Sequence, residues 1–277
     1  MPLIVGIKIL LVAFIAEFFD SSLGMGYGTI LTPFLLLMGF KPLEVVPSVL
    51  LSELITGLLA GFTHHRAGNV NFKLKSTNIF FIVNKIKELG FCHSLSEGVS
   101  LHLRIAILIG ICSVAGTLFA VFVAIRLSKF WLVILIGTII FLMGVVILAT
   151  INKKFKFSWK RLTLLGLIAS FNKGLSGGGY GPIVTGGQLL SGVETKSTVG
   201  ITSLAEGMTC FVGILGYLIM VKNVNLDIAP YNITGALLAV PLAGLGVKVI
   251  KENKLRLIIG VFTLILGLLT LTNTLSP

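Results

Sequence analysis

Charged side chains are scarce in this sequence. Asp, Glu, Lys and Arg together make up 12% of the 277 residues, whereas hydrophobic residues make up 55% and the mean hydropathy is +1.04. A soluble globular domain carries about 25% charged residues, so this composition excludes an ordinary soluble domain. The composition indicates a protein embedded in a lipid bilayer.

Acidic residues are the scarcer of the two charged classes. The chain has 10 Asp and Glu against 22 Lys and Arg, which gives a net charge of +12. Fifteen of these 22 basic residues fall in three segments between apolar runs, at 63–104, 151–161 and 248–256. Such clustering is typical of cytoplasmic loops that face anionic lipid, so we expect no nucleic-acid partner.

Residues that build disulfide frameworks, metal sites and catalytic centres are also few. The three cysteines are scattered and form no C-x-x-C pair, which argues against a disulfide framework and a zinc site. The chain has no Ser/His/Asp cluster and no phosphate-binding G-x-x-x-x-G-K-[ST] loop, so we expect no enzymatic activity, no cofactor and no metal. All four histidines fall in or beside one loop, where we expect them to be solvated: His64, His65, His93 and His102.

Apolar runs long enough to cross a bilayer recur along the whole chain. A helical span needs about 20 apolar residues. Two shorter apolar runs, 28–40 and 181–192, follow glycine-rich motifs, and the short run 160–172 leads into the second of these motifs. The pattern predicts an all-α integral membrane protein with spans at 3–19, 43–62, 104–124, 130–150, 197–221, 228–247 and 255–273.

The two glycine motifs resemble each other. The run G-M-G-Y-G-T-I-L-T at 24–32 returns 153 positions later as G-G-G-Y-G-P-I-V-T at 177–185. Each glycine inside a helix costs roughly 0.5–1 kcal/mol relative to alanine, so neither run suits a helix interior. Irregular backbone in a membrane survives only where it is buried in protein or lines a wet cavity. The motifs therefore predict broken or re-entrant helices around a binding site.

The flanks of the motifs match as well. An ungapped comparison of 16–53 with 169–206 gives 14 identities in 38 positions, including the glycines, the tyrosine, a threonine and a glutamate. We interpret the chain as a duplication within one transmembrane domain, with a first repeat at 1–151 and a second at 152–277. The first repeat carries an insertion near 76–102, which we expect at the membrane surface.

Loop charges predict how the two repeats are oriented. Five membrane elements in each repeat place all three basic segments on one side, and this odd number inverts the second repeat relative to the first. Equivalent loops of the two repeats then carry opposite charge bias, as inverted repeats require. We expect a multi-pass protein of the cell membrane with segments 63–104, 151–161 and 248–256 in the cytoplasm.

With these features the sequence resembles the sulfite exporter TauE/SafE family, also called the toluene sulfonate uptake permease family. The resemblance rests on the doubled G-x-G-Y-G element, on the Asn-Val-Asn pieces at 69–71 and 223–225, and on the Ala-Gly helices that close each repeat. The resemblance covers nearly all of the chain except the insertion. It implies secondary transport of small anions such as sulfite or sulfonates. The chain departs from the family pattern at Met25, Asn71 and Asn225, which leaves the substrate open.

A dry anion site needs hydrogen-bond donors and positive potential, and backbone N–H groups at a glycine turn that opens a helix provide both. Close helix packing through small residues is the alternative reading of the glycines. The tyrosines of the motifs are either hydroxyl donors or interfacial anchors. The predicted substrate-binding residues are Gly24, Gly26, Tyr27, Gly28, Thr32, Lys173, Ser176, Gly177, Gly178, Gly179, Tyr180, Gly181 and Thr185.

Charged residues within the apolar runs are candidates for function. Lys173 precedes the second motif and corresponds to Asp20 in the first repeat, so it either attracts the anion or pairs with Asp20. Glu53 and Glu206 correspond to each other and are candidates for coupling transport to protons, together with Asp20. Capping of a broken helix is their structural alternative. Because the second motif has the extra glycine and the lysine, we expect it to hold the anion more tightly.

The sequence therefore predicts a secondary anion transporter that works by alternating access. A cation-coupled or cation transporter that uses Glu53 and Glu206, and a passive anion channel, are the alternatives. The expected partners are a small anion, the lipid bilayer and possible further copies of the same chain.

Overall fold

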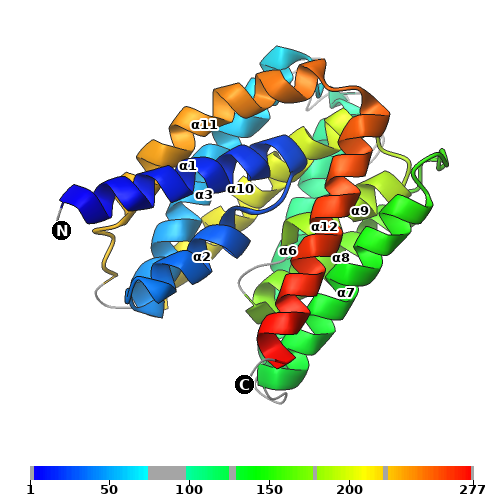
Figure 1. Cartoon of the computed structure of the whole chain (residues 1–277). Coiled ribbons are helices and arrows are strands. Elements are labelled where there is room, and N and C mark those ends of the chain that lie inside the picture. The colour runs from blue at the N-terminus through cyan, green and yellow to red at the C-terminus, as the bar shows by residue number, and fades with distance from the viewer. Residues whose placement is uncertain (1–2, 74–97, 125–128, 177–179, 221–223, 276–277) are drawn as a thin grey trace, which may run out of the picture.

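The structure is a computed structural model that describes residues 3–73, 98–124, 129–176, 180–220 and 224–275. The described residues form ten α-helices, as the composition predicts (Figure 1). In chain order they are α1 (Leu3–Leu23), α2 (Tyr27–Leu37), α3 (Pro42–Ala67), α6 (Leu101–Ala124), α7 (Lys129–Ala149), α8 (Trp159–Ser176), α9 (Tyr180–Leu190), α10 (Thr195–Met220), α11 (Ala229–Val249) and α12 (Glu252–Leu275). Most of the insertion predicted near 76–102 lies outside the described residues.

Glycines in the left-handed region mark several helix ends. Gly68 caps α3 with a φ of 83°, and Gly39 and Gly192, with φ values of 91° and 86°, follow α2 and α9. A residue with a side chain is strained in this conformation, whereas glycine is not. These three glycines therefore lie at positions where one helix ends before the next begins.

Several helices are long and apolar enough to cross a membrane. Within the described residues, α3, α10, α11 and α12 meet this criterion, and α2 and parts of α6 and α7 are shorter apolar helices. Large apolar side chains face outward on many helices; Leu3, Ile219 and Val249 are among the most exposed. Such surfaces suit contact with lipid, so the chain is a multi-pass membrane protein.

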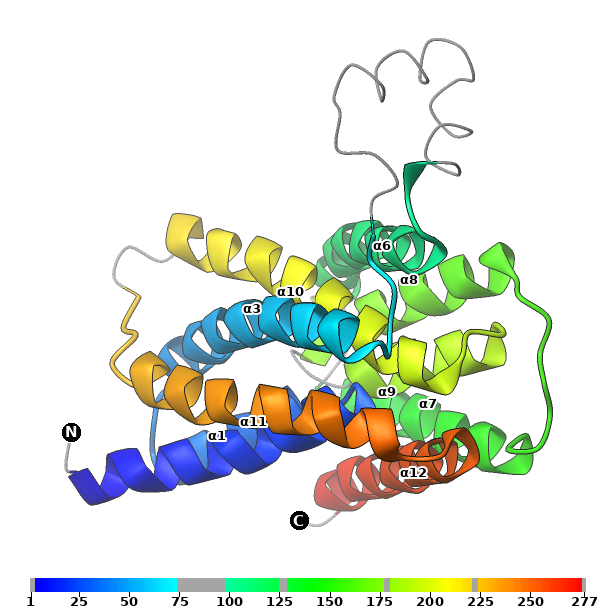
Figure 2. The ribbon, with the colours of Figure 1, turned by 90° about the horizontal axis from the view of Figure 1, so that it is seen from above.

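The helices of the two sequence halves are interleaved (Figures 1 and 2). Helix α11 packs against α1 and α3, whereas α6 packs against α8 and α10. Helices α3 and α10 pack against each other, as do α7 and α12. Helices from each half of the sequence therefore pack against helices from the other half.

Small residues allow the closest of these helix crossings. A Cβ atom on Gly57 of α3 would lie 2.7 Å from the carbonyl oxygen of Ser203 and 2.9 Å from the nitrogen of Gly207, both on α10. A Cβ atom on Gly116 of α6 would meet Ser170 of α8 at 2.5 Å. Backbones approach this closely only through glycine or another small residue.

Helix α9 lies at the centre of the molecule. Every residue from Tyr180 to Leu189 is buried, and the helix packs against α7, α8 and α10. Its counterpart α2 is more peripheral, since Leu37 at its end is 89% exposed. The helix that follows the second glycine motif is thus enclosed by protein on all sides.

Candidate functional site

The first glycine motif is a sharp break between two helices. Gly24 and Gly26 have φ values of 74° and 131°, and the chain enters α2 at Tyr27. The backbone N–H of Tyr27 donates to Oδ1 of Asp20 at 3.2 Å. A carboxyl group of the protein itself therefore occupies the N-terminus of α2, where anions are favoured.

The two glycine motifs contact each other directly. A Cβ atom on Gly181 would lie 2.5 Å from the carbonyl oxygen of Gly24 and 2.7 Å from Cα of Met25. Thr185 Oγ1 donates to the same Gly24 oxygen at 3.0 Å. The structure thus brings three predicted site residues together: Gly24, Gly181 and Thr185.

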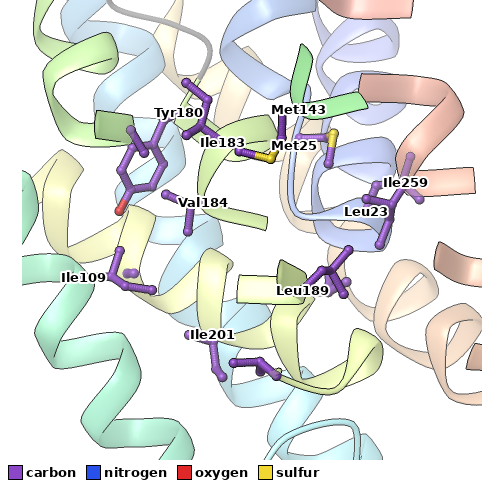
Figure 3. Packing of buried hydrophobic residues seen from close by; sticks show 14 of the residues in the cluster. Leu23, Met25, Ile109, Met143, Tyr180, Ile183, Val184, Leu189, Ile201 and Ile259 are labelled. Carbon is purple, nitrogen blue, oxygen red and sulfur yellow. The ribbon is translucent and has the colours of Figure 1, made fainter. Parts of the chain in front are cut away.

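Side chains from both motifs continue into one apolar cluster (Figure 3). Met25 of the first motif belongs to the same buried cluster as Tyr180, Ile183 and Val184 of α9. Thr263 of α12 donates a hydrogen bond to Sδ of Met25 at 3.2 Å. Met25, which departs from the family pattern, is therefore a packing residue at the junction of the motifs.

Further polar groups extend this junction along α9 and α10. Thr185 Oγ1 lies 3.2 Å from Thr202 Oγ1, and Gln188 Nε2 donates to Thr202 Oγ1 at 2.8 Å. Sequence reasoning did not select Gln188 because its counterpart in the first repeat is Leu35. The sequence signal that could have identified Gln188 is a polar amide side chain within an apolar run.

Both motif tyrosines are buried, with exposed fractions of 0% for Tyr27 and 1% for Tyr180. The Tyr27 hydroxyl lies 2.6 Å from Ser52 Oγ, and the Tyr180 hydroxyl lies 2.9 Å from Ser113 Oγ. Both hydroxyls are held inside the protein, which does not fit the interfacial anchor proposed as one reading of the sequence.

The remaining predicted binding residues are described less fully. Gly28 and Thr32 lie half-buried on the first turns of α2. Lys173 and Ser176 belong to the last turn of α8, and their side chains lie outside the described part of the structure. Gly177, Gly178 and Gly179 fall outside the described residues. The pairing of Lys173 with Asp20 stays a prediction.

Four buried carboxyl groups gather between α1, α3 and α10: Glu17, Asp20, Glu53 and Glu206. They lie close enough to interact electrostatically. Ser21 Oγ donates to Glu17 at 2.6 Å and Thr56 Oγ1 donates to it at 3.1 Å. Sequence reasoning missed Glu17 because the repeat aligns it with Ser170, although an acid inside an apolar run was itself a signal.

The prediction that the histidines are solvated is wrong for His64, which is fully buried near the end of α3. Its Nε2 lies 2.8 Å from the carbonyl oxygen of Ser21 and its Nδ1 lies 3.0 Å from Nδ2 of Asn69. Asn69 Nδ2 also donates to the carbonyl oxygen of Gly244 at 2.8 Å. These bonds satisfy the ring in the interior, and they tie the Asn-Val-Asn piece to α11.

Two of the other histidines, His65 and His102, are half-buried, and His93 falls outside the described part. Within the described segments, no group of three His, Cys, Asp or Glu side chains is arranged to hold a metal ion.

Comparisons with known proteins agree with these features. The family model described as sulfite exporter TauE/SafE matches residues 9–83 and 91–270. The chain is also 26% identical over 274 residues to the probable membrane transporter protein YtnM of Bacillus subtilis (strain 168), a match that covers 96% of this chain and 83% of the relative. No solved structure matches it significantly. The chain belongs to the sulfite exporter TauE/SafE family, a family of membrane transporters.

Proposed function

We propose that this protein is a secondary transporter of small anions, sulfite or sulfonates in particular, and that the anion binds at the second glycine motif. The observation that carries the proposal is the contact between Tyr27 N–H and Asp20 at the first motif. There, the Asp20 carboxyl group accepts the hydrogen bond from the N-terminus of α2. At the matching position before the second motif the sequence has Lys173.

This exchange of charge favours the second motif for a mobile anion. The first N–H groups of a helix have no partner within the helix and attract negative charge. At α2 the Asp20 carboxyl group competes with a bound anion for the N–H groups of the helix N-terminus. At α9 the corresponding residue is Lys173, whose positive charge adds to the attraction of an anion. The enclosed position of α9 also suits a site from which water is excluded.

The packing of the helices supports alternating access between two repeats. In the register of the duplication, α1 corresponds to α8 and α6 corresponds to α11. The contact of α1 with α11 then has an equivalent in the contact of α8 with α6. Helices α3 and α10, and α7 and α12, are equivalent pairs that pack against each other. This arrangement is the one expected if the halves exchange roles during transport.

The buried acids are the candidates for coupling. Glu53 and Glu206 lie on the helices that cross near Gly57, and Asp20 lies at the break after α1. A buried carboxyl group is expensive to charge, so it is suited to take up and release a proton as the site opens. Cation transport that uses Glu53 and Glu206 stays the alternative to anion transport, although the described residues hold no group of three carboxyl side chains arranged around a metal ion.

Counterflow of labelled sulfite in proteoliposomes tests the proposal. We expect saturable exchange by the unmodified protein and its loss in Lys173→Ala and Gly179→Leu. Lys154→Ala is the matched control, because it removes an exposed basic residue from segment 151–161, and it should retain exchange. Wild-type exchange in both site variants would contradict the site. Conductance that neither saturates nor exchanges would indicate a passive channel, and sodium-dependent flux without sulfite would indicate the cation transporter.

We further propose that the protein lies in the cell membrane with its three basic segments in the cytoplasm, and that it acts without a cofactor.

A further inference from the structure

Buried polar side chains line the contact between α9 and α10. Three of them lie on α10 at spacings of four and three residues, which places them on one face of that helix. The other three lie on α9 and directly after its end, at spacings of three residues, which makes them neighbours along the helix surface. We call this set the polar seam: Thr195, Thr198, Thr202, Thr185, Gln188 and Ser191.

The polar seam joins the contact between the two motifs to the basic segment 151–161. Its inner end is the hydrogen bond from Thr185 Oγ1 to the carbonyl oxygen of Gly24. Its outer end is Ser191, whose carbonyl oxygen accepts a hydrogen bond from the N–H of Ser158 at 3.1 Å. The six residues from Thr185 to Ser191 correspond to a helical rise of about 9 Å.

Two buried polar atoms of the seam have no hydrogen-bond partner among the described residues: Gln188 Oε1 and Ser191 Oγ. Hydroxyl groups in helices often bond to a carbonyl oxygen of their own helix, as Thr198 does with Glu194 at 3.0 Å. More than nine in ten buried polar groups in proteins have a partner, and ordered water is the partner where the protein supplies none. The two atoms therefore indicate that water reaches the seam.

The first repeat shows that the fold does not require polar residues here. Three positions of the seam correspond, at the offset of 153 residues, to Leu35, Val45 and Val49. These three side chains belong to one buried apolar cluster. A polar lining is thus a property of the second repeat, and helix packing alone does not account for it.

The outer end of the seam carries an excess of positive charge. Segment 151–161 has five basic residues and no acidic one, and residues 191–196 and 248–256 together add five basic residues and two acidic ones. Hydrogen bonds join these three stretches to one another, and we call them the basic end. Arg161 also donates to the carbonyl oxygen of Leu190 at 2.7 Å, at the end of α9. A basic entrance to a neutral polar lining attracts anions and repels cations.

We propose that the polar seam is the aqueous path by which the transported anion moves between the contact of the two motifs and the basic end. This inference rests on the proposed anion transport. The seam is closed in this structure, because all six side chains are buried, and it opens when α9 and α10 move apart. In the open path, hydroxyl and amide groups take over part of the hydration of the anion.

Alkylation of single cysteines by iodoacetate and iodoacetamide, two reagents of similar size that differ by one negative charge, tests the path. The three native cysteines are replaced by serine, and Ser191→Cys is introduced. We expect iodoacetate to react in proteoliposomes from the side that labels the exposed Lys154→Cys. Relative to their rates with free cysteine, iodoacetate should be favoured over iodoacetamide by about tenfold, because the basic end concentrates anions. Alkylation should also block sulfite counterflow.

Ser170→Cys is the matched control. Ser170 is as fully buried as Ser191, but it lies where α8 crosses α6, outside the seam. It should stay unreactive under conditions in which Ser191→Cys is alkylated. Equal rates at the two positions would show general opening of the helices rather than a path, and they would overturn the inference.

Thr198→Cys tests a second position of the seam and replaces Ser191→Cys if that variant does not fold. Absence of iodoacetate reaction at both seam positions in folded protein would overturn the inference, and sulfite counterflow that continues in these variants would leave the proposed function intact. Alkylation of the seam without any sulfite counterflow by the unmodified protein would instead overturn the proposed function, because the path would then carry another solute.

Discussion

Replacing Gly181 by alanine should disturb the contact between the two glycine motifs. The new Cβ atom would lie 2.5 Å from Gly24 O and 2.7 Å from both Cα and Cβ of Met25. Ordinary contacts of a Cβ atom begin near 3.4 Å, so one motif must move by about 1 Å. Two of the three close neighbours are backbone atoms and cannot rotate away. Overpacking of this kind costs about 1–3 kcal/mol.

Helix propensity acts in the opposite direction, because alanine in place of a helical glycine gains about 1 kcal/mol. Gly246 of α11 isolates this gain, since a Cβ atom there would meet nothing within 4 Å. Gly246→Ala should therefore stabilise the protein by about 0.5–1 kcal/mol. The difference between the two variants then reports the motif contact alone, at about 1–3 kcal/mol.

The assay is unfolding of both variants in the same detergent, followed by sulfite counterflow in proteoliposomes. We expect Gly181→Ala to melt below Gly246→Ala and to lose exchange, because the shift also moves Gly24 away from Thr185. Equal melting temperatures for the two variants would refute the reasoning, since they would mean that the motifs do not touch as described.

Three further predictions concern coupling, orientation and the buried histidine. Glu53→Gln and Glu206→Gln should abolish uptake driven by a pH gradient but leave sulfite counterflow, because exchange needs no net proton movement; loss of both activities would indicate a structural role instead. With the native cysteines replaced by serine, Lys154→Cys should react with an impermeant maleimide only from the cytoplasm and Lys41→Cys only from outside, and labelling from the same side would reject inverted repeats. His64→Leu should lower the free energy of unfolding by about 1–3 kcal/mol, measured as a lower melting temperature, because it leaves buried polar partners unpaired; an unchanged melting temperature would contradict the assigned bonds.

Much of the fold was predictable because it depends on local sequence. Each apolar run predicted from 43–62 to 255–273 corresponds to one helix and extends beyond that helix by at most one residue, since helix is the local way to satisfy backbone polar groups in lipid. The first glycine run breaks the chain between α1 and α2 because its positive φ values are local as well. The family could also be read from these motifs, and the match over residues 9–83 and 91–270 confirms it.

Parts of the site were not predictable from the repeat pattern. Glu17 and Gln188 have no like counterpart in the other repeat, so a comparison of the halves passes over both. His64 was expected to be solvated because all four histidines lie in or beside one loop. Only the position of Asn69 and α11 around it shows that its ring nitrogens are satisfied in the interior.

The sequence alone determined that this chain is a helical membrane protein of the TauE/SafE family with two glycine breaks, because hydropathy, helix length and backbone conformation depend on neighbouring residues. Only the tertiary structure decided that the first glycine motif contacts the start of α9 at Gly181, that the Asp20 carboxyl takes the N-terminus of α2, and that Gln188 of the buried helix α9 has an amide oxygen without a hydrogen-bond partner among the described residues. These features depend on contacts between residues far apart in the chain, and the choice of partners among many apolar helices is made by close packing of small residues rather than by hydropathy.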